Sequence, residues 1–169
     1  MTWTPRFSAR FEGPIVDNVL AIVTRDMKSA LDYFYPSDEL PDFVERSLGT
    51  ELGLEFPILV IGPRSNPVET VDDDSHLIEP QVIELKVGVI AESPDAAMRK
   101  IMKYVRALDA VLRSASKSDY CANMTNGNNQ PFGFAVDVTH IYGPLGANDS
   151  RTTYFKPASL ELSVQFRER

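Results

Sequence analysis

The sequence predicts an α+β fold: a four-stranded, mainly antiparallel sheet with two long helices on one face, in the order α-β-β-α-β-β. Two observations predict it. Apolar residues recur every three or four positions in two long segments, and they alternate with polar residues in the strand-like segments. With 169 residues and 43% hydrophobic content, the chain is expected to form a single domain over residues 1–169.

The first helix is expected from Pro14 to about Tyr35. Pro14 suits a first helical turn, where its missing N–H would have no partner in any case. Pro36 ends the segment because a proline cannot continue a helix interior. The apolar positions form one core-facing stripe: Val16, Leu20, Val23, Met27, Ala30 or Leu31, and Phe34.

The second helix is expected from Pro94 to about Ser114, with Ser93 as its N-cap. Its apolar stripe consists of Met98, Ile101, Val105, Leu108 and Leu112. Another face carries four bases: Arg99, Lys103, Arg106 and Arg113. A solvated face is the first interpretation, and a contact with an acidic protein neighbour, such as the loop bearing Asp72 to Asp74, is the second. Nucleic-acid binding ranks last because no aromatic residue is interleaved with the bases.

Four segments have the composition of strands. The first is an apolar run bounded by prolines, and the other three alternate apolar and polar residues. An irregular acidic stretch is expected between the first helix and the first strand. An N-terminal arm over residues 1–12 and a mobile loop over residues 114–131 are also expected. The four strands are expected at residues 56–63, 81–91, 132–142 and 156–166.

Charge is divided unevenly along the chain. The net charge of −7 argues against a general nucleic-acid-binding surface. Residues 38–95 carry 14 acids and three bases, a net charge of −11. Residues 96–169 carry six acids and ten bases, a net charge of +4. Two faces of opposite sign can pair between copies of the chain, although both can also be simply solvated.

Candidate metal ligands and nucleophiles are few. Asp72, Asp74 and His76 alternate and so could hold a metal ion, but the loop lacks the glycine and the terminal glutamate of a calcium hand. A solvated acidic loop tip is the preferred interpretation. Cys121 is the one cysteine, and no basic residue lies next to it, so a spare thiol is favoured over a nucleophile. We expect no metal and no cofactor.

Catalytic motifs are also missing from the sequence. It has no phosphate-binding loop, no H-E-x-x-H helix and no G-x-S-x-G turn. The chain is therefore expected not to be an enzyme. Two alternatives remain open: a small-molecule or peptide-binding bacterial α+β module without catalysis, and an enzyme site at a subunit boundary that uses Asp137 and His140.

Nothing in the sequence predicts a membrane partner. No apolar run approaches the roughly 20 residues of a membrane-spanning helix. The first residues lack the apolar region of a secretory signal. With one cysteine, no intrachain disulfide can form, which fits a reducing cytoplasm.

Several phrases of the sequence resemble one known family. The likeness spans about residues 14–168 and lies in the order and spacing of elements. The phrases are Tyr33-Phe34-Tyr35-Pro36, Glu55-Phe56-Pro57-Ile58-Leu59-Val60-Ile61, Ile83-Glu84-Leu85-Lys86-Val87-Gly88-Val89, Ser93-Pro94-Asp95 and Tyr104-Val105-Arg106-Ala107-Leu108-Asp109-Ala110-Val111-Leu112. Together they resemble the tail terminator and tail-completion proteins of long-tailed bacteriophages.

The resemblance implies a structural, non-catalytic virion component. Such proteins form rings, commonly hexamers, that cap the tail tube and join it to the head-side connector. The implied partners are copies of the chain, the tail tube protein and connector proteins. DNA would pass through the ring without specific binding, and assembly would take place in the host cytoplasm. No catalytic residue is carried over. The residues expected to make contacts are Asp72, Asp73, Asp74, Arg99, Lys103, Arg106 and Arg113.

Overall fold

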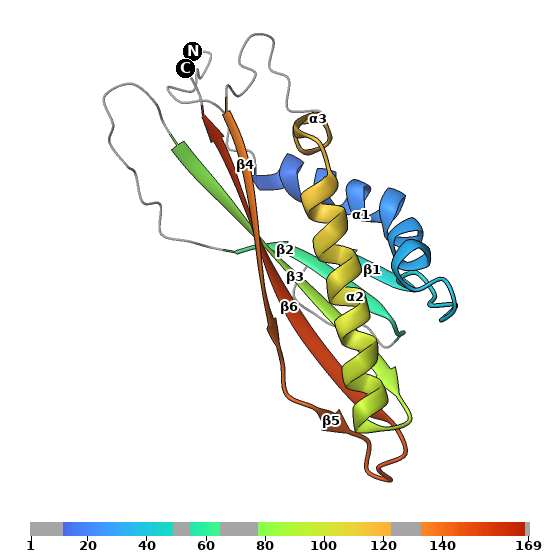
Figure 1. Ribbon diagram of the computed structural model, residues 1–169. Helices are drawn as coiled ribbons and strands as arrows, with labels where there is room; N and C mark the ends of the chain where they lie inside the picture. Colours follow the sequence, from blue (N-terminus) through green and yellow to red (C-terminus); the bar gives the residue numbers. More distant parts are fainter. Residues whose placement is uncertain (1–11, 49–54, 65–77, 123–132, 168–169) are drawn as a thin grey trace.

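The computed structural model describes residues 12–48, 55–64, 78–122 and 133–167. One sheet forms a layer, and the helices lie against one of its faces (Figure 1). The elements are α1 (Glu12–Phe34), β1 (Glu45–Leu48), β2 (Ile58–Pro63), β3 (Ile78–Ala91), α2 (Pro94–Ser114), α3 (Lys117–Tyr120), β4 (Gly133–Tyr142), β5 (Gly146–Ala147) and β6 (Tyr154–Arg167). None of the helices within these ranges is long and apolar enough to cross a membrane.

The sheet is larger and more mixed than expected. Its strands follow the order β1-β2-β3-β6-β4, and β5 pairs with the start of β6. The β1–β2 pair is parallel, whereas the other pairs are antiparallel. The α+β class is confirmed, but the prediction of four strands in the order α-β-β-α-β-β is wrong. The two extra strands have only four and two residues, too few to show an alternating pattern.

Both long helices cover the same face of the sheet, as predicted. The strand register places apolar side chains in rows on that face, because paired residues share a side. One row contains Leu59, Val87 and Ala158, and the next contains Ile61, Leu85 and Leu160. These six residues belong to one buried cluster with the apolar stripes of α1 and α2. The α1 part of the cluster includes Ile15, Val16, Val19, Ile22, Val23, Met27 and Leu31.

The start of α2 agrees with the sequence prediction. The Ser93 hydroxyl accepts a hydrogen bond from the Ala96 N–H at 3.2 Å, and Pro94 opens the helix. Ile101, Val105 and Leu108 are buried as the periodicity requires. At the far end, the backbone N–H of Ala115 donates to the Val111 carbonyl and closes the last turn.

The opposite face of the sheet is polar in one part and apolar in another. Glu84 forms an ion pair with Lys86 at 3.4 Å, and Glu161 forms one with Arg64. These charged pairs make this part of the outer face polar. Ion pairs this exposed contribute little to stability, so their main effect is to keep this part of the face hydrated.

An aromatic cluster occupies the apolar part of the outer face. The rings of Phe56 and Phe155 lie 5.4 Å apart, and Ile58 beside them is fully buried. A Cβ atom on Gly88 would lie 2.9 Å from both Ile58 and Phe155. Gly88 therefore lets these side chains close over the strand, a contact that any larger residue would obstruct.

Helix α3 corrects the expectation of a mobile loop over residues 114–131. Ser116 and Asp119 form a reciprocal capping box that fixes the first turn. Tyr120 is fully buried, and its hydroxyl donates to the Leu112 carbonyl at 2.6 Å. Residues 123–131 of the predicted loop, and residues 1–11 of the predicted arm, lie outside the described residues.

A buried asparagine joins α1 to the segment that follows α3. The Asn18 side-chain amide donates to the Tyr120 carbonyl at 2.9 Å and to the Ala122 carbonyl at 2.6 Å. Arg25, two turns further along α1, donates to the Asp119 carboxylate at 2.7 Å. Hydrogen bonds from Arg25 and Ser116 lower the pKa of Asp119. These contacts hold α3 against α1 and close one end of the helix layer.

Candidate interaction surface

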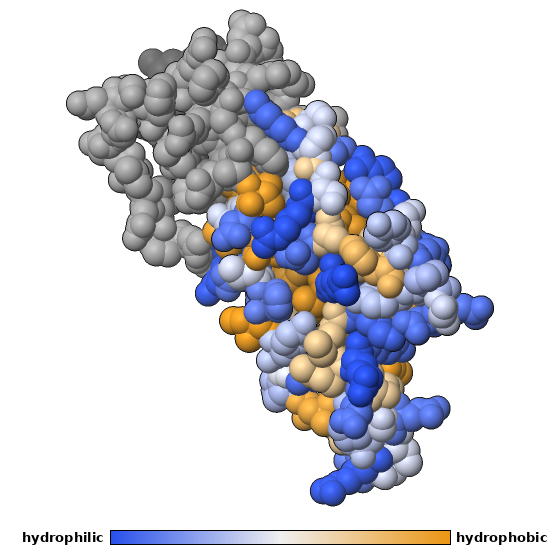
Figure 2. Space-filling model, in the orientation of Figure 1, coloured by the Kyte–Doolittle hydropathy of each residue, from blue (hydrophilic) through white to orange (hydrophobic). Residues whose placement is uncertain are grey.

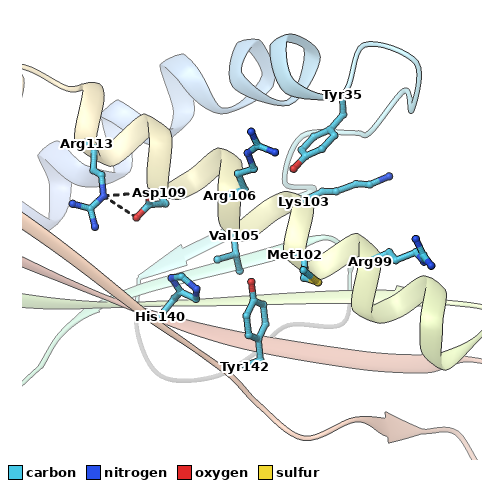
Figure 3. Close-up of a pocket in the computed structure, with 10 residues that line it drawn as sticks. All are labelled: Tyr35, Arg99, Met102, Lys103, Val105, Arg106, Asp109, Arg113, His140 and Tyr142. Atoms are coloured by element: carbon cyan, nitrogen blue, oxygen red, sulfur yellow. Dashed lines mark hydrogen bonds and ion pairs between the residues drawn. The ribbon is translucent and has the colours of Figure 1, made fainter.

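An open groove of about 630 Å³ runs over the outward face of α2, between Tyr35 and strand β4 (Figure 3). Helix α2 supplies most of its surface, β4 supplies one wall, and the residue after α1 supplies the other. The residues that line the groove are Tyr35, Arg99, Met102, Lys103, Val105, Arg106, Asp109, Arg113, His140 and Tyr142.

The groove brings together all four bases predicted on the second helix. Arg99, Lys103, Arg106 and Arg113 project from α2 into or beside it (Figure 3). With Asp109 as the one carboxylate among the lining residues, the lining has a net charge of +3. A chain with an overall charge of −7 thus presents a locally basic surface.

Two of these bases are held by their own chain. The Lys103 ammonium donates to Asp38 at 2.7 Å and lies 5.4 Å from the centre of the Tyr35 ring. Arg113 bonds Asp109 at 3.1 Å and the Val138 carbonyl at 2.7 Å. The acidic neighbours expected for the basic face are therefore supplied in part by the chain itself.

The other two bases have no carboxylate partner among the described residues. Arg106 lies 4.8 Å from the centre of the Phe34 ring, a cation–π contact that leaves its donors available. Arg99 is exposed, at the end of the groove opposite to Arg113 (Figure 3). Both guanidinium groups can therefore bind a carboxylate of another molecule without first breaking an ion pair within the chain.

Aromatic and sulfur-containing side chains complete the groove. Tyr142 and His140 lie edge to face with ring centres 5.5 Å apart. Burial, and then the nearby Tyr35, raise the pKa of Tyr142, which keeps its hydroxyl protonated. Met102 is 48% exposed. The sequence named His140 only for a possible enzyme site with Asp137, and it did not single out Met102 or Tyr142.

The other candidate residues named from the sequence are not among the described residues that line the groove. Asp72, Asp73, Asp74 and His76 lie outside the described residues. Cys121 is half-buried, and burial raises the pKa of its thiol against the smaller opposing effect of Lys117. A raised pKa leaves less thiolate at neutral pH, which agrees with a spare thiol.

Asp137 and His140 do not form a joint site. They lie three positions apart on β4, so their side chains point to opposite faces of the sheet. Asp137 instead lies 3.9 Å from Arg113. Across the described part of the chain, no three His, Cys, Asp or Glu residues gather closely enough to hold a metal ion.

The surface around the groove is mixed in hydropathy. Strongly hydrophilic side chains lie over α2, and hydrophobic patches lie on the side of the molecule formed by β4 (Figure 2). Ile141 of β4 is 68% exposed, and Leu145 just beyond β4 is 44% exposed. A charged groove flanked by apolar side chains is typical of a surface that contacts another macromolecule.

Comparison with known proteins gives a distant structural likeness. No protein-family model matches the sequence. No curated protein sequence matches it either. Among solved structures, the fold is similar to a chain in the virion of a native gene transfer agent (GTA) particle, with a TM-score of 0.40 and 10% sequence identity. The alignment covers 89% of this chain and 90% of that chain.

Proposed function

We propose that the protein is a non-catalytic structural component of a phage or phage-like tail. Copies of the chain form a ring that caps the tail tube and joins it to the head-side connector proteins. The protein would thus belong to the virion, at the tail or neck, after assembly in the host cytoplasm. The resemblance of the sequence to tail terminator and tail-completion proteins suggests this role.

The observation that carries the proposal is the separation of opposite charges. The groove over α2 has a net charge of +3, whereas residues 38–95 have a net charge of −11. A closed ring of identical subunits needs two different, complementary surfaces on each subunit. Surfaces of unlike charge meet this need and fix which surface meets which. The overall acidity would also let DNA pass through the ring without binding.

The mass of the protein in solution tests the ring. Light scattering over a range of protein concentrations should show a rise from the 18.9 kDa of one chain to a fixed multiple, six in a hexamer. The association should weaken with added salt, because the screening length falls from about 10 Å at 0.1 M to about 3 Å at 1 M ionic strength. Electron microscopy of the assembled fraction should show rings. A chain that is monomeric at every concentration would contradict the proposal.

Charge reversal in the groove should weaken this association. Replacing both Arg99 and Arg106 by glutamate places two acids where the proposal requires bases, so we expect the association constant to fall at least about tenfold. The fold should be kept because both side chains are exposed. Lys28→Glu on α1 is the matched control and should associate like the wild type. Equal association of the double variant and the control would exclude the groove from the interface.

The acidic side of the interface can be tested in the same assay. Neutralising Asp72, Asp73 and Asp74 to asparagine should weaken association and leave the fold intact. If this triple variant assembles normally, those acids are not interface residues.

The groove also supports a second candidate, a small-molecule or peptide-binding module. Met102, Tyr35 and Tyr142 offer apolar and aromatic surface beside the bases. This function predicts a ligand that shifts the resonances of these side chains in NMR spectra while the mass stays that of one chain.

A further inference from the structure

The open side of strand β4 presents backbone groups that no other described strand pairs with. The Gly143 N–H donates to the Pro157 carbonyl at 3.0 Å. The odd-numbered residues of β4 therefore direct their backbone N–H and C=O groups toward β6. The even-numbered residues therefore direct their N–H and C=O groups away from the sheet. The Arg113 guanidinium reaches the Val138 carbonyl at 2.7 Å, in agreement with this alternation. No described segment pairs with this side of β4.

Strand β1 forms the other open side of the same sheet. The Arg64 N–H donates to the Val82 carbonyl at 2.9 Å, so even-numbered residues of β2 face β3 and odd-numbered residues, such as Leu59, face β1. Leu59 lies opposite Arg46 in the parallel pair, so its backbone bonds Glu45 and Ser47, and Arg46 and Leu48 direct their N–H and C=O groups outward. No described segment pairs with this side of β1.

The two open sides have compatible strand directions. β1 is parallel to β2, and three antiparallel pairings then separate β2 from β4. β1 and β4 therefore run in opposite directions. A rotation about an axis parallel to the strands relates one copy to the next without changing the strand directions. β1 of one copy can therefore lie against β4 of the next copy as an antiparallel pair.

Exposed apolar side chains gather at both open sides. Val44 and Leu48, at β1, are 56% and 53% exposed. Ile141 of β4 is 68% exposed, and Leu145 follows just beyond. Monomeric proteins usually protect such edges with charges, prolines or bulges. Apolar side chains in these positions fit edges that are covered by another chain.

Charge favours unlike edges over like edges. Residues 38–48 carry four acids and one base, and Glu39 and Glu45 have no basic partner among the described residues. The groove beside β4 holds Arg99 and Arg106, which are likewise without carboxylate partners in the described ranges. Pairing β1 with β4 brings unlike charges together, whereas pairing β4 with β4 opposes two basic surfaces.

We propose that successive copies join edge to edge, with the open side of β1 paired to the open side of β4 in the next copy. The sheets of neighbouring copies thereby become one continuous sheet. This inference rests on the proposed ring and names the contact that builds it.

Two proline substitutions test the pairing. His140→Pro and Arg46→Pro each remove an N–H that points outward, so the hydrogen bonds within the sheet are kept. Each variant alone should be monomeric under conditions in which the wild type forms rings. Mixed in equal amounts, they should form a dimer of twice the single-chain mass, because each supplies the edge that the other lacks. His140→Thr and Arg46→Thr keep the N–H groups and should still form rings, so any further loss in the proline variants is due to the missing N–H.

The outcomes separate this contact from the ring itself. If the wild type and both folded proline variants form the same rings, edge pairing is wrong and the ring stands. If the wild type forms no oligomer, the ring is wrong and edge pairing falls with it. If Arg46→Pro dimerises alone, β4 pairs with β4 and the proposal is overturned.

Disulfide trapping gives a second measurement if a proline variant does not fold. Side chains at positions 45 and 141 lie on the same, outer face of the sheet by the strand register. Only directly opposed positions come close enough to link, so in a Cys121→Ser background Glu45→Cys is combined in turn with cysteine at positions 137, 139 and 141, which share the outer face of β4. One of these double variants should give a ladder of linked chains on a non-reducing gel, and each single variant should stay unlinked. Rings in which no double variant gives a ladder would overturn the edge contact.

Discussion

Val105→Asp should abolish folding at room temperature. Val105 is 2% exposed and lies in the core cluster where α2 covers the sheet. A carboxyl group at this position loses its hydration, which costs several kcal/mol even when the group is protonated. Because domains have a net stability of only about 5–15 kcal/mol, this loss removes most of it. Circular dichroism during urea denaturation measures the effect.

Arg99→Asp is the control for this prediction. It adds the same side chain to the same helix at an exposed position without a recorded ion pair among the described residues. Its free energy of unfolding should change by less than about 0.5 kcal/mol, the usual range for surface positions. A folded Val105→Asp with wild-type stability would show that the register of α2 differs from the one described.

Tyr120→Ala should lower the free energy of unfolding by about 3–5 kcal/mol, the range for large aromatic residues in a core. Tyr120 is fully buried although α3 has only four residues. Its ring fills space between α1 and α2, and its hydroxyl bonds the Leu112 carbonyl. The alanine variant loses this packing and leaves a cavity. Urea denaturation of purified variants provides the measurement.

Tyr120→Phe separates the hydroxyl from the ring. This variant keeps the ring and leaves one carbonyl without its donor, a cost of about 1–3 kcal/mol. The phenylalanine variant should therefore lie between the wild type and Tyr120→Ala. If the alanine variant and the wild type have the same stability, α3 contributes nothing to the stability of the core.

The long elements of the fold were predictable because each carries its own pattern. Pro14 lies in the first turn of α1 and Pro36 follows its end, and Ser93 with Pro94 marks the start of α2. The short elements lack such patterns. β1 has the polar sequence Glu-Arg-Ser-Leu, and it forms because β2 supplies a partner from further along the chain. Such pairings depend on tertiary contacts that a local pattern does not contain.

Helix α3 was partly visible in the sequence. Ser116 followed three positions later by Asp119 is a capping signature, and Tyr120 is a large apolar residue beside it. The other half of the explanation lies far away, since Asn18 bonds the carbonyl of Tyr120 across 102 positions of sequence. No local pattern in the loop specifies that contact.

The candidate surface was predictable as a set of bases but not as a groove. Helical spacing alone places Arg99, Lys103 and Arg106 on one side of α2. The walls come from Tyr35 and Tyr142, which lie more than 100 positions apart in the chain. Their approach follows from the packing of α1 and β4 around α2, and this packing could not be derived from the spacing of any one segment.

The position of β6 in the sheet has a consequence for synthesis. β6 is the last of the described strands to leave the ribosome, yet it lies between β3 and β4 in the sheet. Until it emerges, β3 and β4 cannot be joined and their inner sides lack their eventual partner. A nascent chain therefore carries unpaired strands and exposed apolar rows, the features that recruit chaperones and promote aggregation.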